Sequence, residues 1–431
     1  MTTPVYCDPT KRHDFVFIFD VLDGNPNGDP DAGNLPRVDP ETMQGIVTDV
    51  AIKRKIRDYV ASMCGKSLYI QNKVALNTLY FKEAKEVPTA KDLVVEVPMG
   101  DEALKKLLEI KEDDKEADEK LLAFRDWLKD IEAEGLQYDP DPENERITYL
   151  GDAGAKDFKG LLEGERKIEV HEQDRIKILA KALGEAKKQK KGKLSRPVRD
   201  EIKSRMCAEY WDIRMFGAVL TAGTNAGQVR GPMQLTFSRS LHPVTPLDPT
   251  ITRVAITKPA DMLRKQTEMG RKPYVTFARY RGHGFYNPFL AEKPEELARS
   301  GEAGKIAGKD TETNVCGPRT VGKTYITEGD LTAFWEAFDE SRMFREAKSA
   351  SNGEMIVRAV YIFTHSDPKG DAASHRLFEM VETALENLKE GKERPDSPND
   401  YAALPTRVDV QEKIEACDKT KGKITINVLC L

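Results

Sequence analysis

The segment from Phe15 to Arg57 constrains the fold more than any other part of the chain. It opens with five consecutive apolar residues, FVFIF, which favour a buried central strand over one with a polar face. The residues that follow are rich in Asp, Asn, Gly and Pro, whose side chains and φ preferences favour consecutive turns. The pattern predicts a strand over 14–22, a turn-rich loop and a helix over 48–63.

The predicted helix at 48–63 combines an apolar stripe with a basic face. Thr48 can cap its N-terminus, and Asp49 in the first turn suits the helix dipole. The apolar stripe consists of Ile52, Ile56, Tyr59 and Val60. Three cations lie off this stripe: Lys53, Arg54 and Arg57. A polyanion could lie across that basic face.

The overall acidity of the chain hides a strong segregation of charge. The 431 residues carry a net charge of −5, and their number suggests one to three domains. Residues 101–145 hold 17 Asp and Glu against 7 Lys and Arg. Residues 185–205 hold 9 Lys and Arg against 3 acids, and residues 253–281 hold 8 against 2. Because distant charges are screened, such local basic surfaces decide whether phosphate can bind.

The spacing of the cysteines and the hydropathy of the chain indicate in which compartment of the cell the protein is expected. The six cysteines are scattered without a CxxC pair, which fits reduced thiols in a cytoplasm better than disulfides or a zinc site. No run approaches 18 apolar residues, so no transmembrane helix is expected. The first residues, MTTPVYCDPTKRHD, lack the apolar core of a secretory signal. We therefore expect a cytoplasmic protein with no membrane partner.

The remaining pattern predicts an α+β fold. A short strand is expected near 67–72 and an extended stretch near 74–82. Charged helices are expected over 100–134 and 172–191, separated by a loop at 138–164. Further elements are strands near 229–237, 273–281 and 355–363, helices over 328–346 and 373–390, and a terminal strand in ITINVLCL. This order predicts a mostly antiparallel sheet covered by helices on one side, compatible with a ferredoxin-like core.

Two motifs suggest ligands but lack the required context. Gly317–Thr324, GPRTVGKT, matches the Walker A pattern, yet polar residues precede it and no helix follows at once, which favours a surface loop. Asp23–Asn34 opens like a calcium loop, but its twelfth residue is Asn and two prolines interrupt it. An anion-facing, turn-rich loop is the better interpretation. His283 and His365 could act as general bases, although lone histidines in strands are more often structural.

Several separate elements suit a phosphate backbone. They are the basic helix face at 53–57, the MFGAV corner at 215–219, the GQVRG turn at 227–231 and the basic excursion at 246–272. Glycines at 217, 227 and 231 would let a sugar–phosphate chain approach closely. Cations on such elements fix position without reading sequence. The absence of an RNP1 pattern argues against base stacking on a sheet face.

Five stretches of this sequence resemble a known family. They are FDVLDGNPNGDPDAGNLPRVDPET, WDIRMFGAVL, GQVRGPMQLTFSRSLHPV, MGRKPYVTFARYRGHGFYNPFLA and GEMIVRAVYIF. In order and with matching gaps, they resemble the backbone subunit of the subtype I-C CRISPR Cascade complex, a member of the RAMP superfamily. The resemblance implies a modified RNA-recognition-motif palm with helical fingers and a protruding thumb. It also implies copies stacked along one CRISPR RNA, with no cofactor or metal.

The resemblance extends to partners and domain boundaries. Expected partners are CRISPR RNA, target DNA through the guide, neighbouring copies, other Cascade subunits and a recruited helicase–nuclease. It implies palm segments at 1–84, 206–245 and 273–431, a helical charged insertion at 85–205 and a thumb at 246–272.

It also implies site residues. The RNA-binding set is Asn25, Asn27, Arg37, Lys53, Arg54, Arg57, Phe216, Gly217, Val219, Gln228 and Arg230. Thumb candidates for intercalation or contact are Met262, Arg264 and Met269.

An enzymatic alternative stays open within the same superfamily. Related RNA-cleaving complexes use an Asp of a backbone subunit to cut target RNA. Asp23, Asp29 and Asp31 lie in the first loop, so a metal-dependent endoribonuclease is the second hypothesis. The first hypothesis is a binder without catalytic residues.

Overall fold

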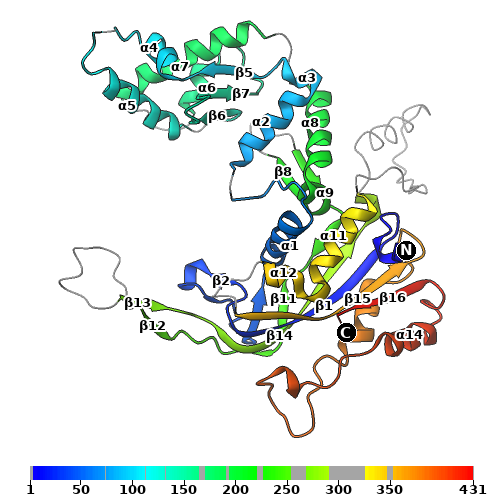
Figure 1. The fold of residues 1–431 in the computed structure, drawn as a ribbon. Coiled ribbons are helices and arrows are strands. Elements are labelled where there is room, and N and C mark those ends of the chain that lie inside the picture. The colour runs from blue at the N-terminus through cyan, green and yellow to red at the C-terminus, as the bar shows by residue number, and fades with distance from the viewer. Residues whose placement is uncertain are drawn as a thin grey trace, which may run out of the picture. The chain divides into compact units, whose positions relative to one another are not determined.

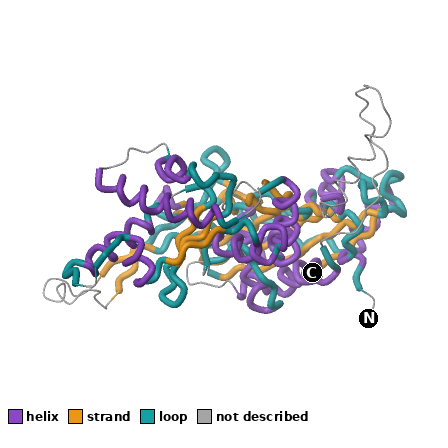
Figure 2. The backbone as a smooth tube through the Cα atoms, turned by 90° about the horizontal axis from the view of Figure 1, so that it is seen from above, coloured by secondary structure: helices purple, strands orange, loops and turns teal. Residues whose placement is uncertain are grey.

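The computed structural model describes most of the chain as two compact units (Figure 1). The first unit comprises Met1–Ser67, Arg214–Phe216 and Gly231–Leu431, and the second comprises Leu68–Ile213 and Gly217–Arg230. The described residues are 3–72, 74–111, 113–131, 133–164, 170–190, 194–220, 227–253, 268–290, 326–346 and 353–430. Both units combine helices with strands, which are drawn in purple and orange in Figure 2.

The first unit is built on a seven-stranded antiparallel sheet in the order β16–β15–β1–β14–β11–β4, with β10 also paired to β14. Its strands are β1 (His13–Gly24), β4 (Gln44–Val47), β10 (Met233–Leu235), β11 (Ser238–Pro243), β14 (Val275–Tyr286), β15 (Glu354–His365) and β16 (Ile424–Leu429). The FVFIF run lies in β1, between the long strands β14 and β15. The predicted central strand is confirmed.

One face of this sheet is covered by three helices, two of which contact it through aromatic rings. The helices are α1 (Asp49–Met63), α11 (Glu328–Phe338) and α12 (Arg342–Glu346). Phe15 meets the rings of Phe334 and Trp335, with centroids 5.9 and 4.9 Å away. On β14, Gly284 lies opposite Phe15, and a Cβ there would come within 1.9 Å of that ring. Glycine is therefore required at this position to accommodate the phenylalanine.

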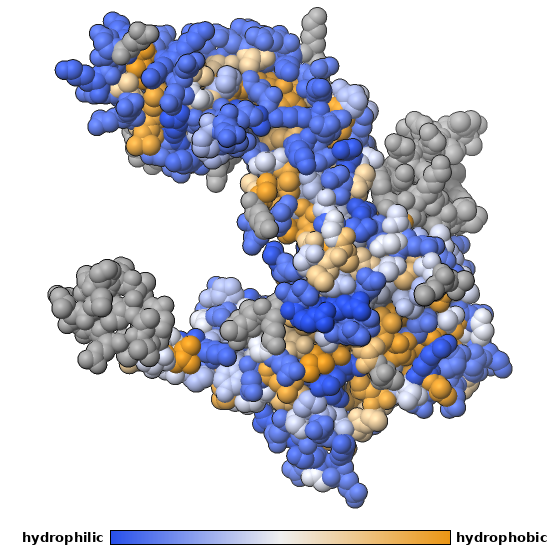
Figure 3. Space-filling model, in the orientation of Figure 1, coloured by the Kyte–Doolittle hydropathy of each residue, from blue (hydrophilic) through white to orange (hydrophobic). Residues whose placement is uncertain are grey.

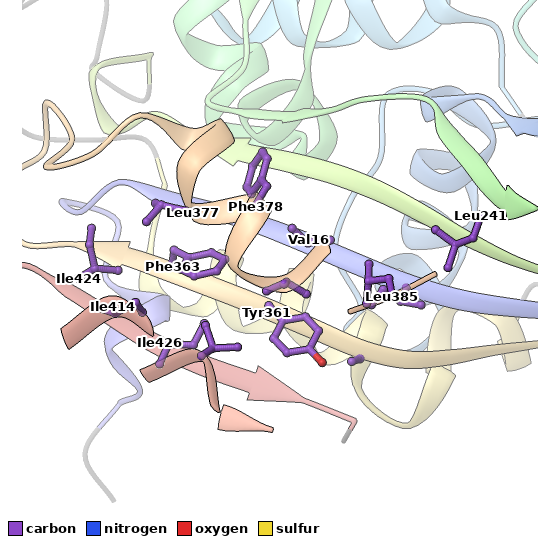
Figure 4. Close-up of a cluster of buried hydrophobic side chains, with 14 of the residues drawn as sticks. Val16, Leu241, Tyr361, Phe363, Leu377, Phe378, Leu385, Ile414, Ile424 and Ile426 are labelled. Atoms are coloured by element: carbon purple, nitrogen blue, oxygen red, sulfur yellow. The ribbon is translucent and has the colours of Figure 1, made fainter. Parts of the chain in front are cut away.

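The other face of the sheet packs against α13 (Ser374–Glu382) and α14 (Arg407–Ala416). Figure 4 shows Val16, Phe363 and Leu377 among the buried side chains that join these helices to β1, β15 and β16. The expectation of helices on one side only is wrong. Because consecutive residues of a strand point to opposite faces, five apolar residues in a row require cover on both faces.

Two short β pairs and several single turns complete the first unit. β12 (Thr250–Arg253) and β13 (Glu268–Arg271) form an antiparallel ribbon between β11 and β14 in the chain, and β2 (Gly28–Asp29) pairs with β3 (Leu35–Pro36). Figure 1 shows the β12–β13 ribbon extending away from the main sheet. Turns of 3-10 helix lie at Val5–Cys7, Pro30–Ala32, Pro288–Leu290, Asp339–Ser341 and Pro398–Asp400.

The second unit has its own core and its own sheet, ordered β5–β7–β6. Its strands are β5 (Val95–Pro98), β6 (Leu136–Asp139) and β7 (Arg146–Tyr149), with a separate hairpin of β8 (Gly217–Leu220) and β9 (Gly227–Arg230). Its helices are α2 (Leu76–Glu86), α3 (Pro88–Lys91), α4 (Asp101–Leu107), α5 (Ala117–Lys129), α6 (Phe158–Glu163), α7 (Val170–Lys188) and α8 (Arg196–Glu209). Helix α9 (Trp211–Phe216) crosses the boundary between the units.

The second unit departs from the sequence prediction in several places, and no strand forms at 67–72, where a short one was expected. The residues expected to be extended near 74–82 form helix α2, where Leu79, Tyr80 and Ala84 are buried at helical spacing. The expected loop at 138–164 contains β7 and α6. The unit begins at Leu68. Among the described helices, none is both long and apolar enough to cross a membrane.

Candidate nucleic-acid interface

The loop after β1 is held together by two asparagine side chains. Asn25 is buried and donates from Nδ2 to the carbonyl of Asn34, 2.6 Å away. Asn27 Oδ1 accepts from both the backbone N–H and the hydroxyl of Thr48, each at 2.9 Å. Thr48 precedes the first turn of α1, so Asn27 fixes the loop to the start of this helix. These hydrogen bonds make both residues supports of the loop.

The charged residues of the same loop form a weak ion pair and no metal cluster. Arg37 lies 3.4 Å from Asp29 through its Nη2 atom, with both side chains about one-third exposed. Asp23 and Asp31 are exposed. Within the described residues, no group of three or more His, Cys, Asp or Glu side chains could hold a metal ion.

Helix α1 buries two of its three predicted RNA-binding cations. Lys53 is 9% exposed and Arg57 is 6% exposed, and both lie over the ring of Phe216. Lys53 Nζ also bonds to Asp49 at 2.8 Å. The broad basic face expected on this helix is thus reduced, because tertiary packing covers the side that includes residues 53 and 57.

Arg54 is the predicted cation of α1 that stays at the surface. Its side chain is 46% exposed and pairs with Asp58 one turn along the helix, at 2.9 Å. Exposed pairs with this spacing are worth only about 0.3–0.5 kcal/mol. A phosphate could therefore compete with Asp58 for Arg54 at little cost to folding.

The β8–β9 hairpin brings four predicted residues onto one face. Gly217 pairs with Arg230, and Val219 pairs with Gln228. Directly paired residues point to the same side of a ladder, and so do residues two apart in one strand. The side chains of Val219, Gln228 and Arg230 are exposed, whereas Leu220 on the opposite face is buried. Gly217 leaves this face open beside Arg230.

The β12–β13 ribbon presents one predicted residue on its surface. Met269 is 77% exposed and pairs with Thr252. Ile251, which is also exposed, lies on the other face of the ribbon opposite Gly270. Figure 3 shows apolar surface in orange on this ribbon. Met262 and Arg264 lie outside the described residues, as does the Walker-like segment Gly317–Thr324.

The two histidines considered as bases occupy structural hydrogen-bonding positions. His365 is buried, accepts at Nδ1 from the backbone of Asp371 at 2.8 Å and donates from Nε2 to Asp14 at 3.1 Å. His283 stacks on Phe378, with ring centroids 4.6 Å apart, and bonds to Glu382. His283 therefore anchors α13 to the sheet, and His365 anchors the loop that precedes α13.

A buried charge cluster that the sequence analysis missed lies at the centre of the sheet. Asp20 of β1 is fully buried and accepts from Arg279 of β14 through both carboxylate oxygens, at 2.7 and 3.0 Å. Arg358 of β15 donates to the same carboxylate at 2.7 Å. The Arg279 guanidinium also lies 4.0 Å from the ring centroid of Tyr401. The sequence feature that could have revealed this cluster is Asp20, an aspartate directly after the apolar run of β1. A carboxylate buried at such a position requires cationic partners.

A second buried carboxylate joins three segments of the first unit. Asp330 accepts from Arg214 through both oxygens, at 3.0 and 2.8 Å, and pairs with Lys66 at 3.3 Å. It also forms a capping box with Thr327 at the start of α11. Burial alone would raise the pKa of Asp330, but the hydrogen bonds and charge of Arg214 outweigh it and hold that pKa below its usual value.

The protein is thus a mixture of helices and strands. Its exposed candidate RNA-binding cations Arg54 and Arg230 lie on a helix and on a β hairpin. The model of the family described as CRISPR-associated protein Cas7 matches residues 11–130 and 156–405, most of the chain. The protein belongs to this family. This membership agrees with the CRISPR family that the five sequence stretches resemble.

One curated protein and two solved structures are similar to this chain. A CRISPR-associated protein Cas7 of Haloferax volcanii is 52% identical over 48 residues, which are 11% of this chain and 14% of that protein. The solved structure of a CRISPR RNA-guided surveillance complex in a pre-nicking state is similar, with a TM-score of 0.39 at 17% identity over 89% of this chain and 84% of that chain. The solved structure of another CRISPR RNA-guided surveillance complex is also similar, with a TM-score of 0.38 at 13% identity over 97% of this chain and 91% of that chain.

Proposed function

We propose that this protein is the non-catalytic CRISPR RNA-binding backbone subunit of a subtype I-C Cascade complex. Several copies line one guide RNA and display it for pairing with target DNA, alongside the other Cascade subunits. A recruited helicase–nuclease then cuts the DNA. The observation that carries this proposal is the match of the Cas7 family to residues 11–130 and 156–405.

The topology of the first unit supports its assignment as the palm. Along the chain come β1, α1, β11, β14, α11 and β15, the βαββαβ order of ferredoxin-like folds. The β12–β13 ribbon leaves this core between β11 and β14, the place proposed for the thumb. We assign the second unit to the fingers.

The distribution of exposed residues supports a sequence-independent grip on RNA. Each unit by itself exposes hydrogen-bond donors: Arg54 on α1 of the first unit, and Gln228 and Arg230 on the hairpin of the second. Donors to phosphate set register and orientation without reading bases. Met269 on the ribbon is the described candidate for opening a stacked base step.

The test is to purify the expressed protein and analyse what accompanies it. We expect RNase-resistant RNA in the preparation and a large assembly that dissociates when the RNA is removed. Incubation with labelled RNA and Mg²⁺ should show protection. Cleavage that disappears in Asp23→Asn, Asp29→Asn or Asp31→Asn would instead support the endoribonuclease.

Replacing Arg54 with Gln should weaken RNA binding by a similar factor for all RNA sequences. Because one phosphate would no longer be neutralised, the slope of log affinity against log salt should fall by roughly 0.7 to 1. Folding should hardly change, because the Arg54–Asp58 pair is exposed. Filter-binding titrations at several salt concentrations measure the slope.

Arg376→Gln provides the matched control, since Arg376 is exposed on α13, on the opposite side of the sheet. It should keep the wild-type slope. An effect of Arg54→Gln confined to certain RNA sequences would contradict a scaffold role.

A further inference from the structure

Phe216 is the last residue of α9, and the aromatic core fixes its ring. Only 7% of the residue is exposed. The ring meets Phe334 of α11 at an interplanar angle of 64°, with centroids 6.3 Å apart. Phe334 is itself fully buried against Phe15 of the central strand. The position of the Phe216 ring therefore depends on the core of the first unit.

Two cations of α1 lie over this ring. Lys53 Nζ is 5.6 Å and Arg57 Cζ is 5.1 Å from the centroid of Phe216. The two residues are four apart, so they share one side of the helix. A cation within about 6 Å of an aromatic face is attracted by the ring quadrupole. Asp49 adds a hydrogen bond to Lys53 at 2.8 Å.

This arrangement leaves little room for an RNA base on Phe216. Base stacking requires an open aromatic face, and the exposed part of this residue is too small to provide one. The ring meets a phenylalanine edge and two cations of the protein. Phe216 thus differs from the exposed aromatic platforms of proteins that stack bases.

We propose that Phe216 is a positioning residue, which orients Lys53 and Arg57 for the RNA phosphates and does not stack on bases. The inference rests on the proposed RNA-binding function. Long cationic side chains lose rotamer freedom when they hold a phosphate, and a ring that already orders them reduces that cost. Lys53 and Arg57 are only 9% and 6% exposed, and burial of this degree strengthens each charge interaction because the surrounding dielectric is lower than in water.

The test compares Phe216→Leu with the wild type on two single-stranded RNAs, one with normal bases and one with abasic sites. We expect about tenfold weaker binding to both RNAs, because neither cation would keep the ring that orients it. The slope of log affinity against log salt should fall by roughly 0.7 for each phosphate that the variant no longer neutralises. Phe216→Tyr, which keeps the ring, should retain the wild-type slope. Phe216→Met gives a second ring-free variant should the leucine variant not fold.

Phe378→Leu is the control for general loss of core packing. Phe378 is 6% exposed and lies on the opposite face of the sheet, so its replacement should leave the salt slope unchanged. A Phe216→Leu effect limited to the base-bearing RNA would show stacking and overturn the inference. A slope of log affinity against log salt that is unchanged in Phe216→Leu would also overturn the inference. Failure of the wild type to bind either RNA would instead reject the proposed function, and the positioning role with it.

Discussion

Replacing Asp20 with Asn should destabilise the first unit by about 3–5 kcal/mol, the usual cost of removing one partner from a buried ion pair. The carboxylate of Asp20 holds Arg279 and Arg358 across the three central strands. Water has little access to Arg279 to replace this carboxylate, because the arginine side chain is only 5% exposed. The asparagine would preserve shape but leave the guanidinium without a counter-charge.

Hydrogen exchange of the β1, β14 and β15 amides measures this effect within the first unit. It is preferable to a single melting temperature, because a chain with two units need not unfold in one step. Asp58→Asn, which breaks the exposed pair with Arg54, serves as a control and should cost under about 0.5 kcal/mol. A destabilisation below about 1 kcal/mol in Asp20→Asn would show that the cluster relaxes without its carboxylate.

Replacing Asp330 with Asn should have a comparable effect, with a defined dependence on pH. The cost at neutral pH should again be about 3–5 kcal/mol, because Arg214 is nine-tenths buried. The pKa of Asp330 is lowered in the folded protein, so its ionised form favours folding. This stabilisation is fully present above the ordinary carboxyl pKa of 3.8 and is lost as the pH falls through the lower folded value.

The measurement is the free energy of unfolding of the wild type minus that of Asp330→Asn, determined from about pH 7 downward. The subtraction removes the titration of other carboxylates shared by both proteins. We expect a constant difference at higher pH that shrinks below the ordinary carboxyl pKa of 3.8. A difference that grows on acidification would mean that the carboxylate is held neutral.

The fold was predictable from sequence where a single pattern determines the structure. Five apolar residues in Phe15–Phe19 identified the central strand, and the spacing of Ile52, Ile56, Tyr59 and Val60 identified the buried stripe of α1. The extended stretch predicted at 74–82 was wrong. Tyr80 and Phe81 favour a strand by propensity but lie in a helix whose buried positions follow a 3.6-residue period.

The candidate site was less predictable, because burial depends on residues distant in sequence. Lys53 and Arg57 were expected to be surface cations, and packing against Phe216, more than 150 positions away, covers them. The one-faced arrangement of Gly217, Val219, Gln228 and Arg230 depends on the register of the β8–β9 hairpin. The RNA-binding roles of these residues stay predictions.

The path of the chain between the two units restricts how either could be isolated. Arg214–Phe216 belong to the first unit, although segments of the second unit flank them on both sides. An excision of 68–230 with a short linker would remove Arg214, the partner of Asp330, and Phe216, which packs against Phe334. A minimal version of the first unit must therefore retain this tripeptide, for example through two separate linkers or a permuted chain.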